Sequence, residues 1–164
     1  ISNYFSSLAL YFRVFEFNAS VYYVIRWLGE QAGSDSIPLI ARIALPVITF
    51  ISIITIAARE KGTDWASLFP VMLLCLSVYL LFSTGVHPWN LTPLVILAVF
   101  TRYRYVLPWS LLIVLAYATY QTIPYAENPW LVAVEYVVVL GWAAWEIRAN
   151  RVSPRIEKGF DHAS

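Results

Sequence analysis

Long apolar runs separated by short polar stretches make up the middle of this chain. A helix needs about 17–25 mostly apolar residues to cross a lipid bilayer. The runs that approach or reach this length are 37–57, 65–84, 88–101, 106–123 and 129–147. The third is the shortest, and at about 1.5 Å per residue it reaches only about 20 Å. The pattern predicts an all-α fold, a polytopic bundle of about five transmembrane helices.

The composition favours a membrane location. The chain has 164 residues, of which 60% are hydrophobic and only 13% are charged. A soluble domain carries about twice this share of charge, and the surplus apolar surface exceeds what a core of this size can bury. Lipid must therefore cover part of it. The net charge of +1 excludes the concentrated basic face of a nucleic-acid-binding protein, and the single cysteine, Cys75, excludes a disulfide framework within the chain.

Basic residues gather on one side of the predicted bundle. Eight of the eleven lysines and arginines follow the first, third or fifth run: Arg59, Lys61, Arg102, Arg104, Arg148, Arg151, Arg155 and Lys158. Because positively charged loops stay in the cytoplasm, this side is the cytoplasmic one. The extracytoplasmic face then carries residues 1–36, the segment STGVHPWN (83–90) and the loop before the fifth run.

The two ends of the chain are more polar than its middle. Asn18 suits a helix N-cap and Gly29 or Gly33 suits a helix end, but a helix over 18–31 would reach only about 20 Å. We therefore expect an extracytoplasmic interfacial segment over 1–36, five spans over 37–147 and a basic cytoplasmic tail over 148–164. The chain starts without Met or a signal-peptide pattern, so we also expect it to be the C-terminal part of a longer protein.

Arginines near the outer face are candidates for binding a phosphate. The guanidinium groups of Arg13 and Arg26 offer a bidentate fork to phosphate oxygens. They suit interfacial anchoring, or pairing with Glu16 and Glu30, at least as well. Arg42 lies six residues into the first run, and its side chain reaches the outer interface by extending outward.

Glu135 and Gln121 are polar residues inside predicted spans. Glu135 lies about 7–8 Å below the outer interface, counted from the interfacial Trp130. An ionisable group at this depth normally faces the bundle interior or a water-filled cavity and often has a function. The alternative is that Glu135 only pairs with Arg42 or with a tyrosine. Gln121 belongs to a polar stripe whose simplest role is hydrogen bonding between helices.

The corner at His87 combines four residue types of different chemistry. The imidazole of His87 can donate to a phosphate or a sugar hydroxyl, or transfer a proton near neutral pH. Pro88 fixes the turn, and Trp89 offers a flat apolar face for a sugar ring, although interfacial tryptophans are common without such a role. No set of cysteines and histidines indicates a metal site or another cofactor. A divalent cation is left open.

Two stretches carry a resemblance to a known family. FEFNASVYYVIRWLG (15–29) and LLFSTGVHPWNLTPLVILAVFTRYRY (80–105) resemble the C-terminal half of bacterial polytopic glycosyltransferases of the GT-C superfamily. More narrowly, they resemble mannosyltransferases of Bacteroidetes-type bacteria, whose pattern reads approximately FEFN-x-S-xx-Y and then S-T-x-HPWY-L. PWSLLIVLAYATYQ and ENPWLVAVEYVVVLGWAAWE are also similar to that group, so the resemblance extends to about residue 148.

The resemblance implies a function in the bacterial cytoplasmic membrane. Members of the superfamily transfer a sugar from a polyprenyl-phosphate carrier to a glycan or protein acceptor on the extracytoplasmic side. It implies roles in binding the donor phosphate or sugar for Glu16, Asn18, His87, Pro88 and Trp89.

This chain departs from the family pattern in two ways. Asn90 stands where the family has tyrosine, so a stacking or phenolic role would be lost there. The family's acidic catalytic base precedes the matching region, so we expect the base upstream of this chain and expect the chain alone to be inactive.

Two other functions fit the same residues. The chain could be a non-catalytic membrane subunit whose polar outer residues contact a partner protein. It could also be a small transporter with Glu135 as its proton or ion site. A transporter needs polar groups that connect both faces, and the cytoplasmic halves of the runs have few.

Overall fold

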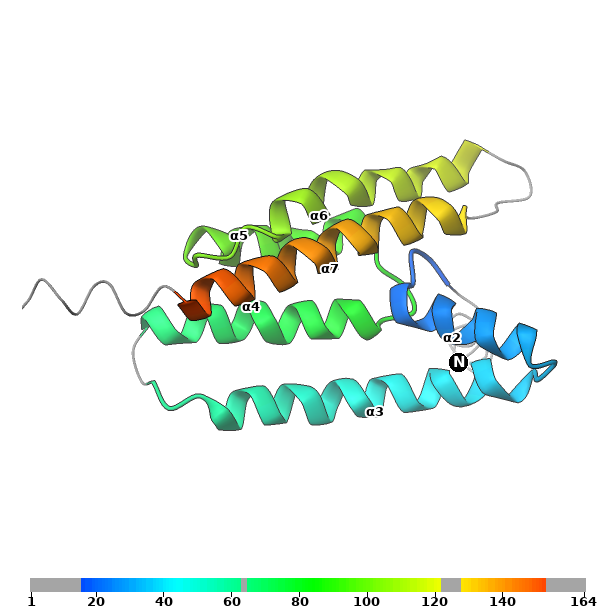
Figure 1. The fold of residues 1–164 in the computed structure, drawn as a ribbon, viewed down its shortest axis with the longest axis horizontal. Coiled ribbons are helices and arrows are strands. Elements are labelled where there is room, and N and C mark those ends of the chain that lie inside the picture. Colours follow the sequence, from blue (N-terminus) through cyan, green and yellow to red (C-terminus); the bar gives the residue numbers. More distant parts are fainter. Residues whose placement is uncertain (1–15, 63–64, 122–127, 153–164) are drawn as a thin grey trace, which may run out of the picture.

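Helices make up almost all of the part of the chain that the structure describes. The structure is a computed structural model that describes residues 16–62, 65–121 and 128–152 (Figure 1). Its elements are α2 (Ser20–Gln31), α3 (Ser36–Arg59), α4 (Trp65–Phe82), η1 (Pro88–Leu91), α5 (Thr92–Val99), α6 (Val106–Leu112), η2 (Ile113–Gln121) and α7 (Pro129–Val152). Within these ranges there is no strand, only an isolated bridge between Phe17 and Gly85. The prediction of an all-α fold is confirmed.

Each predicted apolar run is helical over most of its described residues, but among the helices that the structure describes only two are both long and apolar enough to cross a membrane. These two are Ser36–Arg59 and Pro129–Ala149. The other three apolar helices, Ser67–Phe82, Pro88–Val99 and Val106–Tyr117, are shorter. The five-span bundle therefore stays a prediction, while two helices of spanning length are established by their length and composition.

Successive helices run in alternating directions (Figure 1). The turn between α2 and α3, the segment between α4 and η1, and the start of α7 lie at one end of the molecule. The ends of α3, α5 and α7 lie at the opposite end. Within the described residues, the basic residues that follow the first, third and fifth runs therefore lie at one end of the bundle, the end that the charge pattern predicts to be cytoplasmic.

The interior of the bundle is apolar with a few buried polar groups. One core cluster joins α4, α5, α6 and α7 through buried side chains such as Leu73, Leu80, Leu94 and Trp109. A smaller cluster joins α2 to α3 through Tyr22, Ala41 and Leu45, among others.

The outward faces of the two longest helices are also apolar. On α3 the exposed residues include Leu39, Ile40, Ile43, Val47, Ile48, Phe50, Ile51 and Ile54, and on α7 they include Trp130, Val134, Val137, Leu140, Trp142 and Trp145. An apolar surface of this extent on a monomer marks a protein or membrane contact. Because it follows the full length of both helices, it fits a lipid environment.

The segment before α2 differs from the prediction. The N-cap of α2 is Ala19, and Asn18 lies outside the helix with a positive φ of 51°. The prediction that Asn18 caps the helix is therefore wrong. Asparagine is one of the few residues that tolerate this left-handed conformation, and its side chain is used elsewhere. At the other end of α2, Gly33 has a φ of 63° in the turn that leads into α3.

The fourth and fifth runs also differ from a simple α-helical span. The fourth changes from α-helix to 3-10 helix after Leu112. The fifth continues as α-helix to Val152, so the first part of the predicted tail is helical. The rest of that tail lies outside the described residues.

Candidate functional site

The two motif segments of the sequence are joined by backbone hydrogen bonds. The N–H of Phe17 donates to the carbonyl of Thr84 at 3.0 Å, and the N–H of Val86 donates to the carbonyl of Phe17 at 2.7 Å. The hydroxyl of Ser20 adds a bond of 2.7 Å to the carbonyl of Leu81. The described part of the FEFN segment, Glu16 to Asn18, is thus fixed against the end of α4 and the corner at His87, Pro88, Trp89 and Asn90, here called the HPW corner.

Three aromatic rings stack at this corner. The ring centroids of Phe17 and His87 are 4.5 Å apart at 21°, and those of His87 and Trp89 are 4.3 Å apart at 10°. Burial lowers the pKa of His87, so its imidazole is neutral at neutral pH. Trp89 is 61% exposed, which leaves much of the indole open to a ligand or to lipid.

Asn90 fixes the turn of the HPW corner. Its side-chain oxygen accepts a hydrogen bond of 3.2 Å from the N–H of His87. Its own N–H donates to the carbonyl of His87 at 2.9 Å. The amide of Asn90 therefore has a local structural role in this turn.

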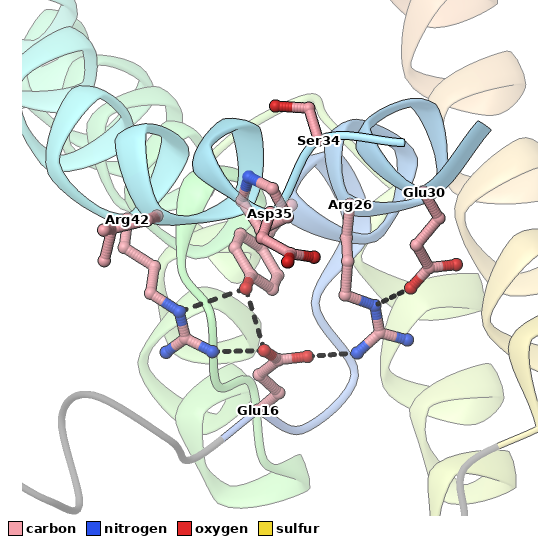
Figure 2. A pocket seen from close by; sticks show the side chains of 9 residues that line it. Glu16, Arg26, Glu30, Ser34, Asp35 and Arg42 are labelled. Carbon is pink, nitrogen blue, oxygen red and sulfur yellow. Dashed lines mark hydrogen bonds and ion pairs between the residues drawn. The ribbon is translucent and has the colours of Figure 1, made fainter. Parts of the chain in front are cut away.

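Glu16 is the centre of a charged cluster next to this corner (Figure 2). Its carboxylate accepts hydrogen bonds from the guanidinium groups of Arg26 and Arg42, and Figure 2 shows it between them. The hydroxyl of Tyr22 donates to the same carboxylate at 2.8 Å and accepts from Nε of Arg42 at 3.0 Å. Glu30 lies 3.5 Å from Nε of Arg26. The side chains of Glu16 and Arg42 are only 15% and 17% exposed.

Tyr22 stays a phenol in this cluster. Burial and, after it, the hydrogen bond to Glu16 raise the pKa of Tyr22. The protonated hydroxyl is therefore the donor to Glu16, and its oxygen remains available to Arg42. The guanidinium of Arg42 also lies over the Tyr22 ring, 5.0 Å from its centroid.

The residues of the cluster line an open pocket of about 600 Å³ between α2 and α3. The lining residues are Glu16, Tyr22, Arg26, Glu30, Ser34, Asp35, Pro38, Leu39 and Arg42. They include two guanidinium groups and three carboxylates, with an apolar edge. Such a mixed lining suits a ligand rich in hydroxyl groups, since it offers both donors and acceptors.

Glu135 is buried beneath the two motif segments. It is 1% exposed, and its two carboxylate oxygens lie 3.1 and 3.2 Å from the side-chain nitrogen of Asn18. Nε1 of Trp109 donates to Oε1 of Glu135 at 3.1 Å. The hydroxyl of Tyr136 donates to the carbonyl of Asn18 at 3.0 Å. Arg42 bonds to Glu16 and Tyr22, so its suggested pairing with Glu135 does not occur.

The structure brings most of the predicted site residues to one end of the bundle. Glu16, Arg26 and Arg42 line the pocket. His87, Trp89 and Asn90 form the neighbouring corner, which connects to the pocket through Phe17, and Asn18 lies between that corner and Glu135. His87 is not a lining residue, so it does not share the pocket with the two arginines. Arg13 and the side chain of Gln121 lie outside the described part of the chain.

The sequence analysis did not predict Tyr22, Trp109 and Tyr136 as residues of this region. Tyr22 and Arg26 are one helical turn apart, and so are Arg26 and Glu30, so the spacing of polar residues on α2 was a usable signal. Trp109 and Tyr136 gave no such signal, because their polar atoms meet partners that are distant in the sequence. Among the described residues, no group of three or more His, Cys, Asp or Glu side chains could hold a metal ion.

Comparison with known proteins adds no relative to this picture. The chain matches no protein-family model, no curated protein and no solved structure.

Proposed function

We propose that this chain is the membrane part of a glycosyltransferase of the GT-C type. In this proposal it transfers a sugar, mannose, from a polyprenyl-phosphate carrier to a glycan or protein acceptor at the extracytoplasmic face of the bacterial cytoplasmic membrane. The observation that carries the proposal is the charged pocket around Glu16, which two arginines and two further carboxylates line and which adjoins the HPW corner. Both motif segments of the family resemblance contribute to this region.

The position of the pocket supports a membrane-surface reaction. The ends of α3, α5 and α7 lie at the end of the bundle that the basic residues predict to be cytoplasmic. The pocket lies at the opposite end (Figure 1). The pocket is at the start of α3, whose outward face is apolar. A lipid-linked donor in the outer leaflet could therefore place its headgroup in the pocket while its chain stays among the helices.

The lining residues suit the two parts of a sugar-phosphate headgroup. Carboxylates such as Glu30 and Asp35 accept hydrogen bonds from sugar hydroxyls, and a guanidinium donates to phosphate oxygens. Arg26 is the more accessible arginine, with 42% of its side chain exposed. Glu16 holds both guanidinium groups in place but also competes with a phosphate for them, so a neutral sugar with one attached phosphate fits better than a highly charged ligand.

The reaction is a displacement at the anomeric carbon. The acceptor hydroxyl loses its proton to a base, its oxygen bonds to the anomeric carbon, and the bond between that carbon and the phosphate oxygen breaks. The polyprenyl phosphate leaves with the electron pair, and Arg26 and Arg42 would stabilise its negative charge. The base is not assigned to a residue of this chain.

Transfer of labelled mannose from polyprenyl-phosphate mannose tests the proposal. It is measured in membranes that hold the full-length protein, because the resemblance implies that the catalytic base precedes this chain. We expect Arg42→Ala to lower the transfer rate by about 10²-fold, the usual effect of removing one donor to a developing negative charge. Arg59→Ala is the matched control, since it removes an exposed arginine from the other end of α3, and it should leave the rate unchanged. Full transfer by Arg42→Ala in the full-length protein would exclude this pocket, and a full-length wild-type protein without transfer would refute the proposed reaction.

The other two functions have less support. A transporter would need Glu135 to face a path for ions, but its carboxylate is 1% exposed and bonded to Asn18 and Trp109. A non-catalytic subunit would use the same pocket to bind a lipid headgroup or a partner. Binding of the labelled donor without transfer would favour that alternative.

A further inference from the structure

Glu135 connects α7 to two other parts of the molecule, the segment before α2 and the helix α6. Through its own carboxylate it binds the side chain of Asn18 and the indole of Trp109 on α6. The adjacent Tyr136 binds the backbone carbonyl of Asn18. The segment before α2 is therefore held by α7 through both its side chain and its backbone.

The conformation of Asn18 explains why this attachment matters. Its φ of 51° is a left-handed conformation that L-residues rarely adopt. Such a conformation persists where the surroundings hold it. The amide bonded to Glu135 and the carbonyl bonded to Tyr136 hold this residue on two sides.

The residues next to Asn18 reach both halves of the candidate site. Phe17 stacks on His87 at 4.5 Å and forms the bridge to Gly85. Glu16, which precedes Phe17, binds the two arginines of the pocket. A rotation of the backbone at Asn18 would move both of these side chains.

We infer that Glu135 is a positioning residue that holds Asn18 in its left-handed conformation and thereby sets the placement of Glu16 in the pocket and of Phe17 on His87. That this placement serves sugar transfer rests on the proposed function, whereas the placement itself can be measured without any substrate. Glu135 is not a lining residue of the pocket, so it acts on the pocket through Asn18.

The second buried acid of α7 provides a matched control. Glu146 follows Glu135 by eleven residues, about three helical turns, and therefore lies on the same face of α7. It is also buried, and it binds the backbone N–H groups of Arg104 and Tyr105 at the opposite end of the bundle. Loss of Glu146 should weaken the fold without moving the site.

Selective labelling of histidine allows the test, because the chain has only two histidines, His87 and His162. Protein in lipid nanodiscs is titrated by NMR, and the His87 signal is identified by its absence in His87→Gln. In Glu135→Met we expect the pKa of His87 to rise toward its ordinary value of about 6.5, since the imidazole loses the cover of Phe17. In Glu146→Met the pKa of His87 should stay as in the wild type.

Two further variants separate positioning from folding. Glu135→Gln keeps Oε1, which accepts from both Asn18 and Trp109, but it replaces Oε2, 3.2 Å from the Asn18 nitrogen, by an NH2 group that cannot accept. The pKa of His87 should therefore rise less in Glu135→Gln than in Glu135→Met. Asn18→Gly removes the amide but tolerates the positive φ. Because Asn18→Gly loses the bond to Glu135, we expect it to raise the pKa of His87. This second variant tests the same contact if Glu135→Met does not fold.

The outcomes are distinct. An unchanged His87 titration in Asn18→Gly, or an equal rise in Glu135→Met and Glu146→Met, would overturn the positioning role. If the titrations follow our expectation but the full-length wild-type protein transfers no sugar, the proposed function fails and the positioning role stands. If transfer occurs, Glu135→Met should lower it by about 10²-fold, the effect of a displacement of about 1 Å at a reacting group.

Discussion

At the residue scale, Glu16 and His87 show how two neighbouring polar groups acquire different environments. Glu16 is surrounded by donors, since Tyr22, Arg26 and Arg42 all bind its carboxylate. His87 instead lies between two aromatic rings, where a charged imidazole loses hydration. One corner of the molecule therefore combines a charged cluster with an imidazole that is kept neutral.

The neutral state of His87 makes a prediction about stability and pH. Burial lowers the pKa of His87 in the folded protein, whereas the unfolded chain has the ordinary value of about 6.5. The unfolded state then binds the proton more readily, so the stability associated with neutral His87 is complete above about pH 6.5 and is lost as the pH falls below it.

Thermal unfolding in nanodiscs at pH 7.5 and pH 5 measures this effect. The wild type should lose more stability over this interval than His87→Gln, because carboxylates that titrate in the same range contribute equally to both proteins. Equal losses would show that His87 is not shielded in the folded state.

Single residues also show where the sequence is informative and where it is not. The polarity of Asn18 suggested a helix cap, but the same short polar side chain suits a left-handed conformation, and local pattern does not distinguish the two. The depth of Glu135 in an apolar run did predict a buried group. Its partner Asn18 is 117 residues away, and no local spacing could identify it.

At the element scale, the runs were predictable and their helix types were not. Hydropathy predicted five helical runs, and each is helical. The fourth has seven residues of α-helix and nine of 3-10 helix, which at about 1.5 and 2.0 Å per residue reach about 28 Å. This is close to the hydrocarbon thickness of about 30 Å, whereas the same residues as α-helix would reach only about 24 Å.

The start of α6 depends on a carboxylate from another helix. Both oxygens of Glu146 accept from the N–H of Arg104 at 2.8 Å, and Oε2 accepts from the N–H of Tyr105 at 2.9 Å. These N–H groups precede the first turn of α6, where a negative charge also compensates the helix dipole. The hydroxyl oxygens of Tyr105 and Ser77 are also hydrogen-bonded, at 2.6 Å. Burial raises the pKa of Tyr105 to about 12.

We expect Glu146→Ala to lower the free energy of unfolding by about 2–3 kcal/mol, since it leaves buried N–H groups without their charged acceptor. Unfolding by SDS, followed by circular dichroism, measures the change. Arg148→Ala removes an exposed side chain two residues away and should change the value by less than about 0.5 kcal/mol. Equal effects of the two substitutions would mean that Glu146 does not hold the start of α6.

At the scale of the whole molecule, the distribution of apolar surface and the alternating helix directions fit one another. The exposed faces of α3 and α7 are apolar along their length, while buried positions include Asn18, Glu135 and Glu146.

The third run is the shortest of the five predicted spans. Its four residues of 3-10 helix and eight of α-helix reach only about 20 Å. Whether this segment crosses the bilayer decides the side on which everything after it lies.

Cysteine labelling distinguishes the two topologies. Cys75 is the only cysteine, so Cys75→Ala gives a background into which single cysteines can be placed at Ser34, Lys61, Asn128 and Arg148. With five spans, an impermeant maleimide added outside intact cells should label positions 34 and 128, and positions 61 and 148 only after permeabilisation. If the third run does not cross, positions 34 and 61 keep this behaviour but 128 becomes protected and 148 accessible, because α6 and α7 then run in the opposite sense through the membrane.

All residues that line the pocket lie between Glu16 and Arg42, before and at the start of the first run. The labelling of position 34 therefore shows on which side of the membrane the pocket lies. Labelling of 34 only after permeabilisation would place the pocket in the cytoplasm and exclude an extracytoplasmic sugar transfer.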